Sequence, residues 1–340
     1  MKKEIGILSL LLFLCGVSSC KEKSLSYQIP EKENHIIGEI WKNANDISLY
    51  TDVEITDSYY VFTEYENEGL LHVYDKNNPS AELASAIHGR EATGLVSVEF
   101  VKSNTRYPSE SDDVWIIDNK SRLKQVRCKK DSLMVVRDIA LPANLNRSID
   151  YNITKDEFYG VPSVGERNKT FYFFHPDSGY YWIDMYDMDK KRYNKNDFAY
   201  YSNLIVHEKR ESIVCAYRFF NKIQFFDLRG NIIKDIFYGK DRIEPKDNSV
   251  EISDFKDNLK CFIDICATDQ YVFCVYDGSY DYTNLSKIMI FKWDGIHVKT
   301  LQTDRIIKSI AVDKLNSYIL ALTANEFKGR DIVRYKLDKL

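Results

Sequence analysis

The chain has 340 residues, of which 44% are hydrophobic and 29% charged, and its formal net charge is −4. This much apolar material is enough for a folded core and excludes an intrinsically disordered protein. No stripe or cluster of Lys and Arg stands out, so we expect no nucleic acid among its partners.

The first nineteen residues have the pattern of a secretory signal peptide. Lys2 and Lys3 precede an apolar run that reaches Val17, which is shorter than the roughly 20 residues that a membrane-spanning helix needs. The small residues before Cys20 resemble a bacterial lipobox, a signal in which the Cys is lipidated and becomes the new N-terminus. We therefore predict lipidation at Cys20 after removal of residues 1–19.

The polar segment that follows, residues 20–34, is predicted to be a flexible tether, and residues 35–340 are predicted to form one domain. Loss of the signal peptide removes two Lys and one Glu and leaves a formal charge of −5. Electrostatics would not draw such a domain onto an acidic membrane surface, so the lipid anchor at Cys20 is the expected membrane contact.

The clearest local pattern is the stretch Ile223–Phe237. Alternating apolar residues run up to Phe226, an Asp-Leu-Arg-Gly-Asn turn follows at Asp227, and a second alternating run begins at Ile232. This is the pattern of a β-hairpin. Tyr (24) and Phe (18) far outnumber Trp (4) and Met (5), which also favours sheet.

Looser copies of this hairpin predict six successive units of short strands. The predicted strands are 55–63, 69–74 and 83–87; 96–102, 114–118, 123–127 and 133–139; 148–153, 157–161, 170–174 and 180–185; 203–207, 212–217 and the two of the hairpin; 261–266, 271–276, 288–293 and 296–301; and 306–312, 317–323 and 331–337. No convincing helix of 12 or more residues appears.

This spacing predicts an all-β fold, a six-bladed β-propeller of four-stranded antiparallel blades. One sheet has two faces to bury, and stacking the sheets around a ring buries both. The last unit offers only three strands, and a ring must close. We therefore expect Ile36–Trp41 or Ile47–Val53 to supply its outer strand from the N-terminal side.

Five cysteines follow Cys20, namely Cys128, Cys215, Cys261, Cys266 and Cys274. An odd number in an exported protein leaves at least one without a disulfide partner. Alternation places Cys261 and Cys274 on one face of a hairpin and Cys266 on the other, so a Cys261–Cys274 disulfide is one reading. Buried thiols that act as small hydrophobes are the favoured reading.

Two turns that close units are alike and supply the candidate ligand-binding residues. His88-Gly89-Arg90 follows the first unit, and Tyr238-Gly239-Lys240 follows the fourth. A Gly directly after a strand suggests a positive φ. The candidates are His88, Arg90 and Lys240, with the basic residues directed at the mouth of the ring, although a solvated turn charge is the simpler reading.

The lipobox, the tether, the six hairpin units and the Gly-basic turn together resemble the TolB-like six-bladed propeller lipoproteins of Bacteroidetes. Members of that family often continue the turn as Gly-Arg-Gly-Pro with an acidic-Phe pair downstream. Here Glu91 and Ala92 follow Arg90, and the acidic-Phe pair is Glu99-Phe100. The resemblance implies the fold and a cell-envelope location, most of all the outer membrane, at its periplasmic face or the cell surface.

No sequence motif for a hydrolase elbow, zinc protease, P-loop or dinucleotide site occurs, so we predict no catalytic residues, metal site or cofactor. Acidic runs at Asp184–Asp189 and Asp277–Asn284 lack the order of a calcium loop, and solvated turn acids explain them. In the pairs Tyr59-Tyr60, Tyr180-Tyr181 and Tyr200-Tyr201, at least one ring should pack between blades rather than stack on a sugar.

We therefore expect a non-enzymatic module, anchored in the membrane, that binds a protein or a glycan. The alternative is a hydrolase or lyase that acts on glycans or peptides through carboxylates at the mouth of the central channel. The two hypotheses differ in whether the channel mouth gathers carboxylates, or a His and an acid, whose pKa values are shifted.

Overall fold

A computed structural model describes residues 26–29, 32–43, 49–64, 69–87, 95–102, 112–142, 148–154, 157–162, 169–175, 177–184, 200–245, 256–325, 329–338 and 340. The elements in these ranges are β-strands, apart from short 3-10 turns such as η3 (Glu208–Arg210). No helix among them has the length and apolar character of a membrane span.

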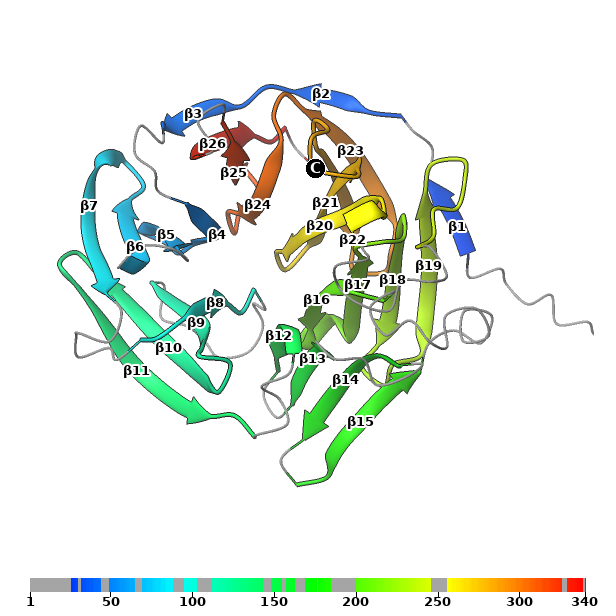
Figure 1. The fold of residues 1–340 in the computed structure, drawn as a ribbon, viewed down its shortest axis with the longest axis horizontal. Helices are drawn as coiled ribbons and strands as arrows, with labels where there is room; N and C mark the ends of the chain where they lie inside the picture. Colours follow the sequence, from blue (N-terminus) through cyan, green and yellow to red (C-terminus); the bar gives the residue numbers. More distant parts are fainter. Residues whose placement is uncertain are drawn as a thin grey trace, which may run out of the picture.

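The strands form six antiparallel blades arranged as a ring (Figure 1). In chain order the blades are β4 (Tyr50–Ile55), β5 (Tyr59–Glu64), β6 (Gly69–Asp75) and β7 (Asn78–Ile87); β8 (Val98–Phe100), β9 (Asp113–Asp118), β10 (Arg122–Lys129) and β11 (Ser132–Ala140); β12 (Ser148–Ile153), β13 (Phe158–Pro162), β14 (Lys169–His175) and β15 (Gly179–Asp184); β16 (Ser202–His207), β17 (Ser212–Tyr217), β18 (Lys222–Asp227) and β19 (Ile232–Tyr238); β20 (Lys260–Ala267), β21 (Tyr271–Ser279), β22 (Lys287–Lys292) and β23 (His297–Thr303); and β24 (Ile307–Val312), β25 (Tyr318–Ala324) and β26 (Arg330–Lys336). The predicted six-bladed β-propeller is confirmed.

The first strand of each blade lies at the centre of the ring, and the later strands follow outward (Figure 1). The prediction of three strands for blade 1 was wrong, and Ile47–Val53, one of the two segments considered for the outer strand of the last blade, is not that strand. Tyr50–Ile55 is instead the inner strand of blade 1, paired with β5, so this blade has four strands rather than the three predicted.

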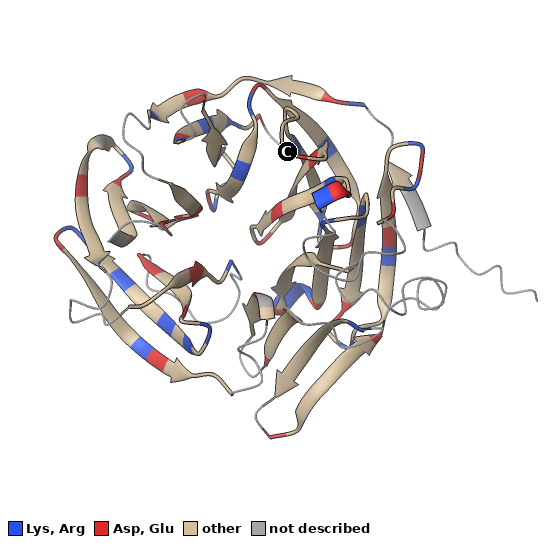
Figure 2. Cartoon of the chain, viewed as in Figure 1, with Lys and Arg blue, Asp and Glu red and all other residues tan. Residues whose placement is uncertain are grey.

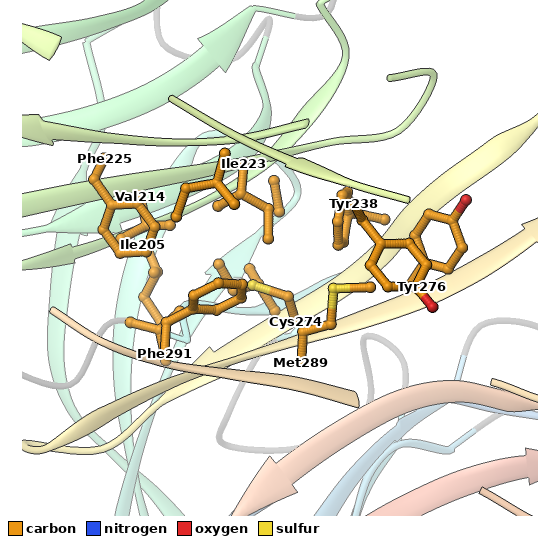
Figure 3. Close-up of a cluster of buried hydrophobic side chains, with 14 of the residues drawn as sticks. Ile205, Val214, Ile223, Phe225, Tyr238, Cys274, Tyr276, Met289 and Phe291 are labelled. Carbon is orange, nitrogen blue, oxygen red and sulfur yellow. The ribbon is translucent and has the colours of Figure 1, made fainter. Parts of the chain in front are cut away.

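The core consists of six buried apolar clusters, one between each pair of neighbouring blades. Figure 3 shows the cluster between blades 4 and 5, where Phe225 and Ile223 face Met289 and Phe291. Their immediate neighbours Ile288 and Ile290 belong to the cluster with blade 6. The period of two in each strand therefore supplies both faces that the ring buries.

The hairpin that carries the clearest sequence pattern has the predicted turn. Gly230 adopts a φ of +82°, and its amide donates to the carbonyl of Asp227 over 3.0 Å. The Asp227 carboxylate accepts the amides of Arg229 and Asn231 at 2.9 and 2.8 Å. A Cβ at Gly230 would lie 2.2 Å from Ile183 of blade 3, so this turn requires Gly for both its conformation and its packing.

Three N-terminal strands, which we call the belt, lie along the outside of the last three blades (Figure 1). β1 (Ser26–Ile29) and β2 (Asn34–Ile36) pair in parallel with β19 and β23, and β3 (Glu39–Lys42) pairs antiparallel with β26. β3 thus completes the last blade, which confirms the predicted closure by an N-terminal strand. The belt also corrects the extent of the predicted tether, because residues 26–29 and 34 within it are strand.

The belt is held by buried contacts as well as by backbone pairing. Ile29 is fully buried in the cluster between blades 4 and 5. Glu33 accepts a hydrogen bond from the Tyr238 hydroxyl at 2.8 Å and pairs with Lys287 at 2.7 Å. Burial raises the pKa of Glu33, but these two partners outweigh it, and the pKa lies below its usual value.

All five described cysteines are free and buried. Cys261 and Cys274 pack in the cluster between blades 4 and 5, whereas Cys266 packs on the opposite face of the blade. The predicted distribution over two faces is correct, and the thiols act as core residues rather than as a disulfide.

Candidate functional site

The central channel is lined by acidic residues at matching positions of the inner strands. Asp52, Asp150 and Asp264 lie on β4, β12 and β20, the inner strands of blades 1, 3 and 5. Each carboxylate accepts the amide of the residue after it, at 2.8 to 2.9 Å. Asp150 also accepts the amide of Leu204 at 2.6 Å, and Asp264 that of Ile310 at 2.7 Å. These Asp residues therefore join one blade to the next.

Lys102 crosses the centre of the ring from blade 2. Its ammonium lies 2.8 Å from Asp52 of blade 1 and 2.8 Å from Asp264 of blade 5, and it donates to the Ser309 hydroxyl of blade 6 at 3.1 Å. Burial lowers the pKa of Lys102, but the two carboxylates outweigh this and raise it above its usual value. The network ties four blades together at the axis.

The channel holds more carboxylates than this one Lys neutralises. Burial raises the pKa of Glu54 to about 7, although Lys102 opposes the shift. Burial likewise raises the pKa of Asp150 to about 7, against the hydrogen bonds from Leu204 and Tyr151. Burial also raises the pKa values of Asp52 and Glu99. Glu54 and Asp150 are therefore expected to be partly protonated near neutral pH.

Replacing Glu54 by Gln should stabilise the protein at pH 8 but not at pH 4.5. The folded state holds the Glu54 proton up to about pH 7, whereas the ordinary pKa of a Glu side chain is 4.5, so wild-type stability falls as the pH rises through this window. Because water reaches the half-buried side chain, we expect a gain of about 1–2 kcal/mol. Urea unfolding of both proteins at the two pH values measures it, and equal stabilities at pH 8 would contradict it.

A large hollow lies beside this channel, at the end of the ring that carries the connections β17–β18 and β21–β22. We call it the mouth pocket. Its volume is about 1070 Å³, and its lining includes Tyr201, Arg218, Phe219, Lys260, Tyr280 and Tyr282. A second hollow of about 490 Å³, the channel pocket, includes Asp52, Glu99, Asp264, Lys308, Ser309 and Arg330. Arg218 and Tyr282 line both pockets, so the two meet at these residues.

The residues Gly278–Asn284, which we call the mouth loop, form one wall of the mouth pocket. Its polar groups bond mostly to each other: the Ser279 amide donates to Asp277 at 2.8 Å, and the Thr283 hydroxyl donates to Asp281 at 2.6 Å. The described residues contain no cluster of three or more His, Cys, Asp or Glu that could hold a metal ion. Asp281 is exposed in the loop, as expected of a solvated turn acid, but Asp277 is buried in β21, so the prediction was wrong for that residue.

Tyr282 is the residue around which the two pockets are arranged. Its φ is +61°, a conformation that costs a non-Gly residue roughly 1 kcal/mol or more. Its hydroxyl accepts a hydrogen bond from Arg218 at 3.1 Å, and its carbonyl accepts one from Lys308 at 3.3 Å. Arg218, Lys260 and Lys308 lie 5.9, 5.9 and 5.1 Å from its ring centroid. Three cations thus lie around one half-buried aromatic ring.

Of the predicted ligand-binding residues, the structure describes only Lys240. His88 and Arg90 lie outside the described residues, as does Cys20. Lys240 is exposed at the corner after β19, where Gly239 has the predicted positive φ of +85°. The Gly239 amide donates to Ile29 of the belt at 3.2 Å, so this corner belongs to the outer edge of blade 4. Lys240 is not among the residues that line either pocket.

Two His–acid sets are described, and neither lines the mouth or channel pocket: His207 lies 3.4 Å from Asp269, and His72 contacts two Glu residues. His72, on the third strand of blade 1, contacts Glu64 at 2.9 Å and Glu82 at 2.8 Å. Burial lowers the pKa of His72, but the two carboxylates outweigh it and raise the pKa. His72 is not among the lining residues of the mouth or channel pocket, so this group of side chains belongs to blade 1 and not to either pocket.

Of the tyrosine pairs, one ring in each packs in or against the core, as predicted. Tyr60 and Tyr200 are buried between blades, and Tyr180 packs against the cluster between blades 2 and 3. Tyr201 is different, because it lines the mouth pocket. Acidic and basic residues are interspersed around the ring (Figure 2).

No protein-family model and no curated protein matches this chain. A crystal structure of a DUF4221 family member from Bacteroides vulgatus is similar, with a TM-score of 0.57 and 12% sequence identity over 90% of this chain and 99% of that one. A protein from Bacteroides fragilis, whose name proposes that it is exported, has a TM-score of 0.52 and 10% identity over 93% and 99%. At these identities the similarity shows the fold alone, and the chain is a six-bladed β-propeller related in structure to proteins of Bacteroides.

Proposed function

We propose that this chain is a non-enzymatic binding module of the cell envelope, anchored by lipid at Cys20, that holds a glycan in the mouth pocket. The observation that carries the proposal is the pocket itself, in which the half-buried rings of Tyr201 and Tyr282 and the exposed ring of Tyr280 combine with cationic side chains. Such a site offers aromatic faces on which sugar rings can stack and few side chains suited to cleaving a glycosidic bond.

The channel carboxylates do not support a hydrolase as directly as the mouth pocket supports a binding module. Asp52, Asp150 and Asp264 accept backbone amides within the ring, and two of them share Lys102. Groups held in this manner serve the junctions between blades. The raised pKa values of several channel carboxylates are the observation for the alternative, and Glu99 is the candidate among them because it lines the channel pocket and is not one of the three Asp residues that join the blades. Product analysis of a glycan incubated with the wild type and Glu99→Gln tests that alternative.

A matched pair of tyrosines tests the binding proposal. Tyr280 is 61% exposed in the mouth pocket, and Tyr181 is 47% exposed on β15 of blade 3. Tyr280→Ala should weaken glycan binding about two- to tenfold, the usual worth of an aromatic contact. Tyr181→Ala should leave it unchanged.

The measurement is a glycan array with the mature protein, followed by titration calorimetry of the strongest ligand with both variants. The proposal fails if no glycan binds the wild type. It also fails if Tyr280→Ala binds as tightly as Tyr181→Ala.

The predicted location in the cell envelope is part of the same proposal. The exported character proposed for the B. fragilis neighbour supports a location in the envelope. Labelling with a radioactive fatty acid tests lipidation, since Cys20→Ala should abolish incorporation if the lipobox is used.

A further inference from the structure

The junction of the two pockets is marked by cationic side chains that have donors left over. Arg218 uses one terminal nitrogen on the Tyr282 hydroxyl and the other on the Ile263 carbonyl, at 3.1 and 3.2 Å. Its Nε is buried and has no hydrogen-bond partner among the described residues. A guanidinium has five N–H donors in a planar fork that matches a carboxylate.

Lys308 faces the same junction from blade 6. Its ammonium donates to the Tyr282 carbonyl, and neither Lys308 nor Arg218 takes part in an ion pair within the described part of the chain. Burial and the nearby Arg330 lower the pKa of Lys308. Asp277 and Asp281 raise this pKa but do not outweigh the other two effects, so a bound anion would further offset the repulsion from Arg330.

The charge of the lining limits what kind of anion fits. The mouth pocket is lined by Arg218, Lys256 and Lys260 on the basic side and by Asp257 and Asp281 on the acidic side. The surplus is a single positive charge, which suits a ligand with isolated carboxylates. A densely charged polyanion would meet the two Asp side chains as well.

A peptide is a poorer fit than a sugar chain. Extended peptides commonly bind by adding a strand to a free sheet edge. The outer edges of blades 4, 5 and 6, which lie nearest the mouth pocket, are already paired with β1, β2 and β3. The pocket is instead an open hollow with aromatic faces, and at about 1070 Å³ it exceeds the volume of one sugar ring.

We infer that the ligand is an acidic oligosaccharide, with a uronate carboxylate held by Arg218 and Lys308 and neighbouring rings against Tyr280 and Tyr282. This inference rests on the proposed glycan-binding function and adds the chemical class of the ligand. Tyr282 is held in place by the same two cations, its hydroxyl by Arg218 and its carbonyl by Lys308, so the site exists before the ligand arrives.

The test compares acidic oligosaccharides with their neutral forms. The probes are oligogalacturonates and oligomannuronates of four residues, each as the free acid and as the methyl ester. Titration calorimetry with the mature protein should show that at least one acid binds at least about tenfold more tightly than its ester, as expected for a charged hydrogen bond. Its affinity should fall as salt rises, whereas that of the ester should not.

Two variants and a control assign the effect to the junction. Arg218→Gln and Lys308→Gln should each weaken binding of the acid about tenfold and leave binding of the ester unchanged. Lys308→Gln keeps the test valid if loss of the Arg218 bond to Ile263 impairs folding. Lys240→Gln removes an exposed cation that lines neither pocket and should change nothing.

The outcomes separate the two proposals. Equal affinity for acid and ester, or full acid binding by Lys308→Gln, overturns the acidic ligand while glycan binding stands. Binding of neither form, together with an array on which no glycan binds, overturns the function and the inference together.

Discussion

Replacing Lys102 by Ala should destabilise the protein by about 3–5 kcal/mol at pH 7, the usual cost of removing one partner from a buried ion pair. The Lys102 side chain is only 11% exposed, and its ammonium lies between Asp52 and Asp264. Without it, two carboxylates in the ring centre face each other with no counterion. Urea unfolding of the wild type and the variant gives the difference.

The loss should shrink as the pH falls. Without Lys102, the two carboxylates should keep their protons to a higher pH in the folded state than in the unfolded chain. The full loss of stability is therefore expected only at pH values at which both carboxylates of the folded protein are ionised. At about pH 4 both states bind protons and the penalty is smaller. A loss that is the same at pH 4 and pH 7 would show that packing rather than charge is involved.

Lys314 is the matched control for Lys102. It forms an ion pair with Asp57 at 2.7 Å, but the two side chains are 56% and 48% exposed. Lys314→Ala should therefore cost only about 0–1 kcal/mol.

Removal of residues 20–43 should lower the melting temperature by more than about 10 °C, since each kcal/mol is worth roughly 2 °C or more in a domain of this size. The deletion strips β3 from blade 6 and exposes the edge of β26. It also removes Ile29 from a closed cluster and Trp41, whose ring lies 4.9 Å from that of Tyr60. Burial of such side chains is worth about 1.5–3 kcal/mol each.

Differential scanning calorimetry of the truncated and full-length mature chains measures the effect. The truncation ends at residue 43 because β4 belongs to blade 1. If the truncated chain melts within 2–3 °C of the full-length chain, which is about 1 kcal/mol, blade 6 does not need the belt.

A point variant separates closure from mere loss of surface. A Cβ at Gly38 would lie 2.2 Å from Val333 and 2.8 Å from Tyr335, so Gly38→Ala should lift the belt from blade 6 and cost about 1–3 kcal/mol. At Gly179 a Cβ meets nothing within 4 Å, although the φ is +82°. Gly179→Ala should cost about 1 kcal/mol from backbone strain alone.

The strands and their order could be predicted because each depends on local pattern. The hairpin at Asp227 has its own turn residues, and its alternation reappears as the two buried faces of blade 4. The strand β4 was misplaced because Ile47–Val53 and Ile36–Trp41 have similar patterns, and only pairing partners distinguish an inner strand from a belt strand.

The mouth pocket and the channel network were not predicted, although one sequence pattern could have indicated the channel residues. Asp52, Asp150 and Asp264 each precede a buried apolar residue in the first strand of a unit, a repeat that aligning the six units would have shown. The β21–β22 connection is also the longest of the six between second and third strands, and it carries Tyr280 and Tyr282.

The sequence by itself predicted most of the strands, their grouping into six units and the need for an N-terminal strand to close the last one, and it favoured a core role for the cysteines. All of these follow from alternation and turn chemistry within a few tens of residues. Only the tertiary structure decided that Arg218, Tyr282 and Lys308 share one junction and that Lys102 reaches Asp264. These residues come from different blades, and their proximity depends on how the ring closes rather than on any spacing along the chain.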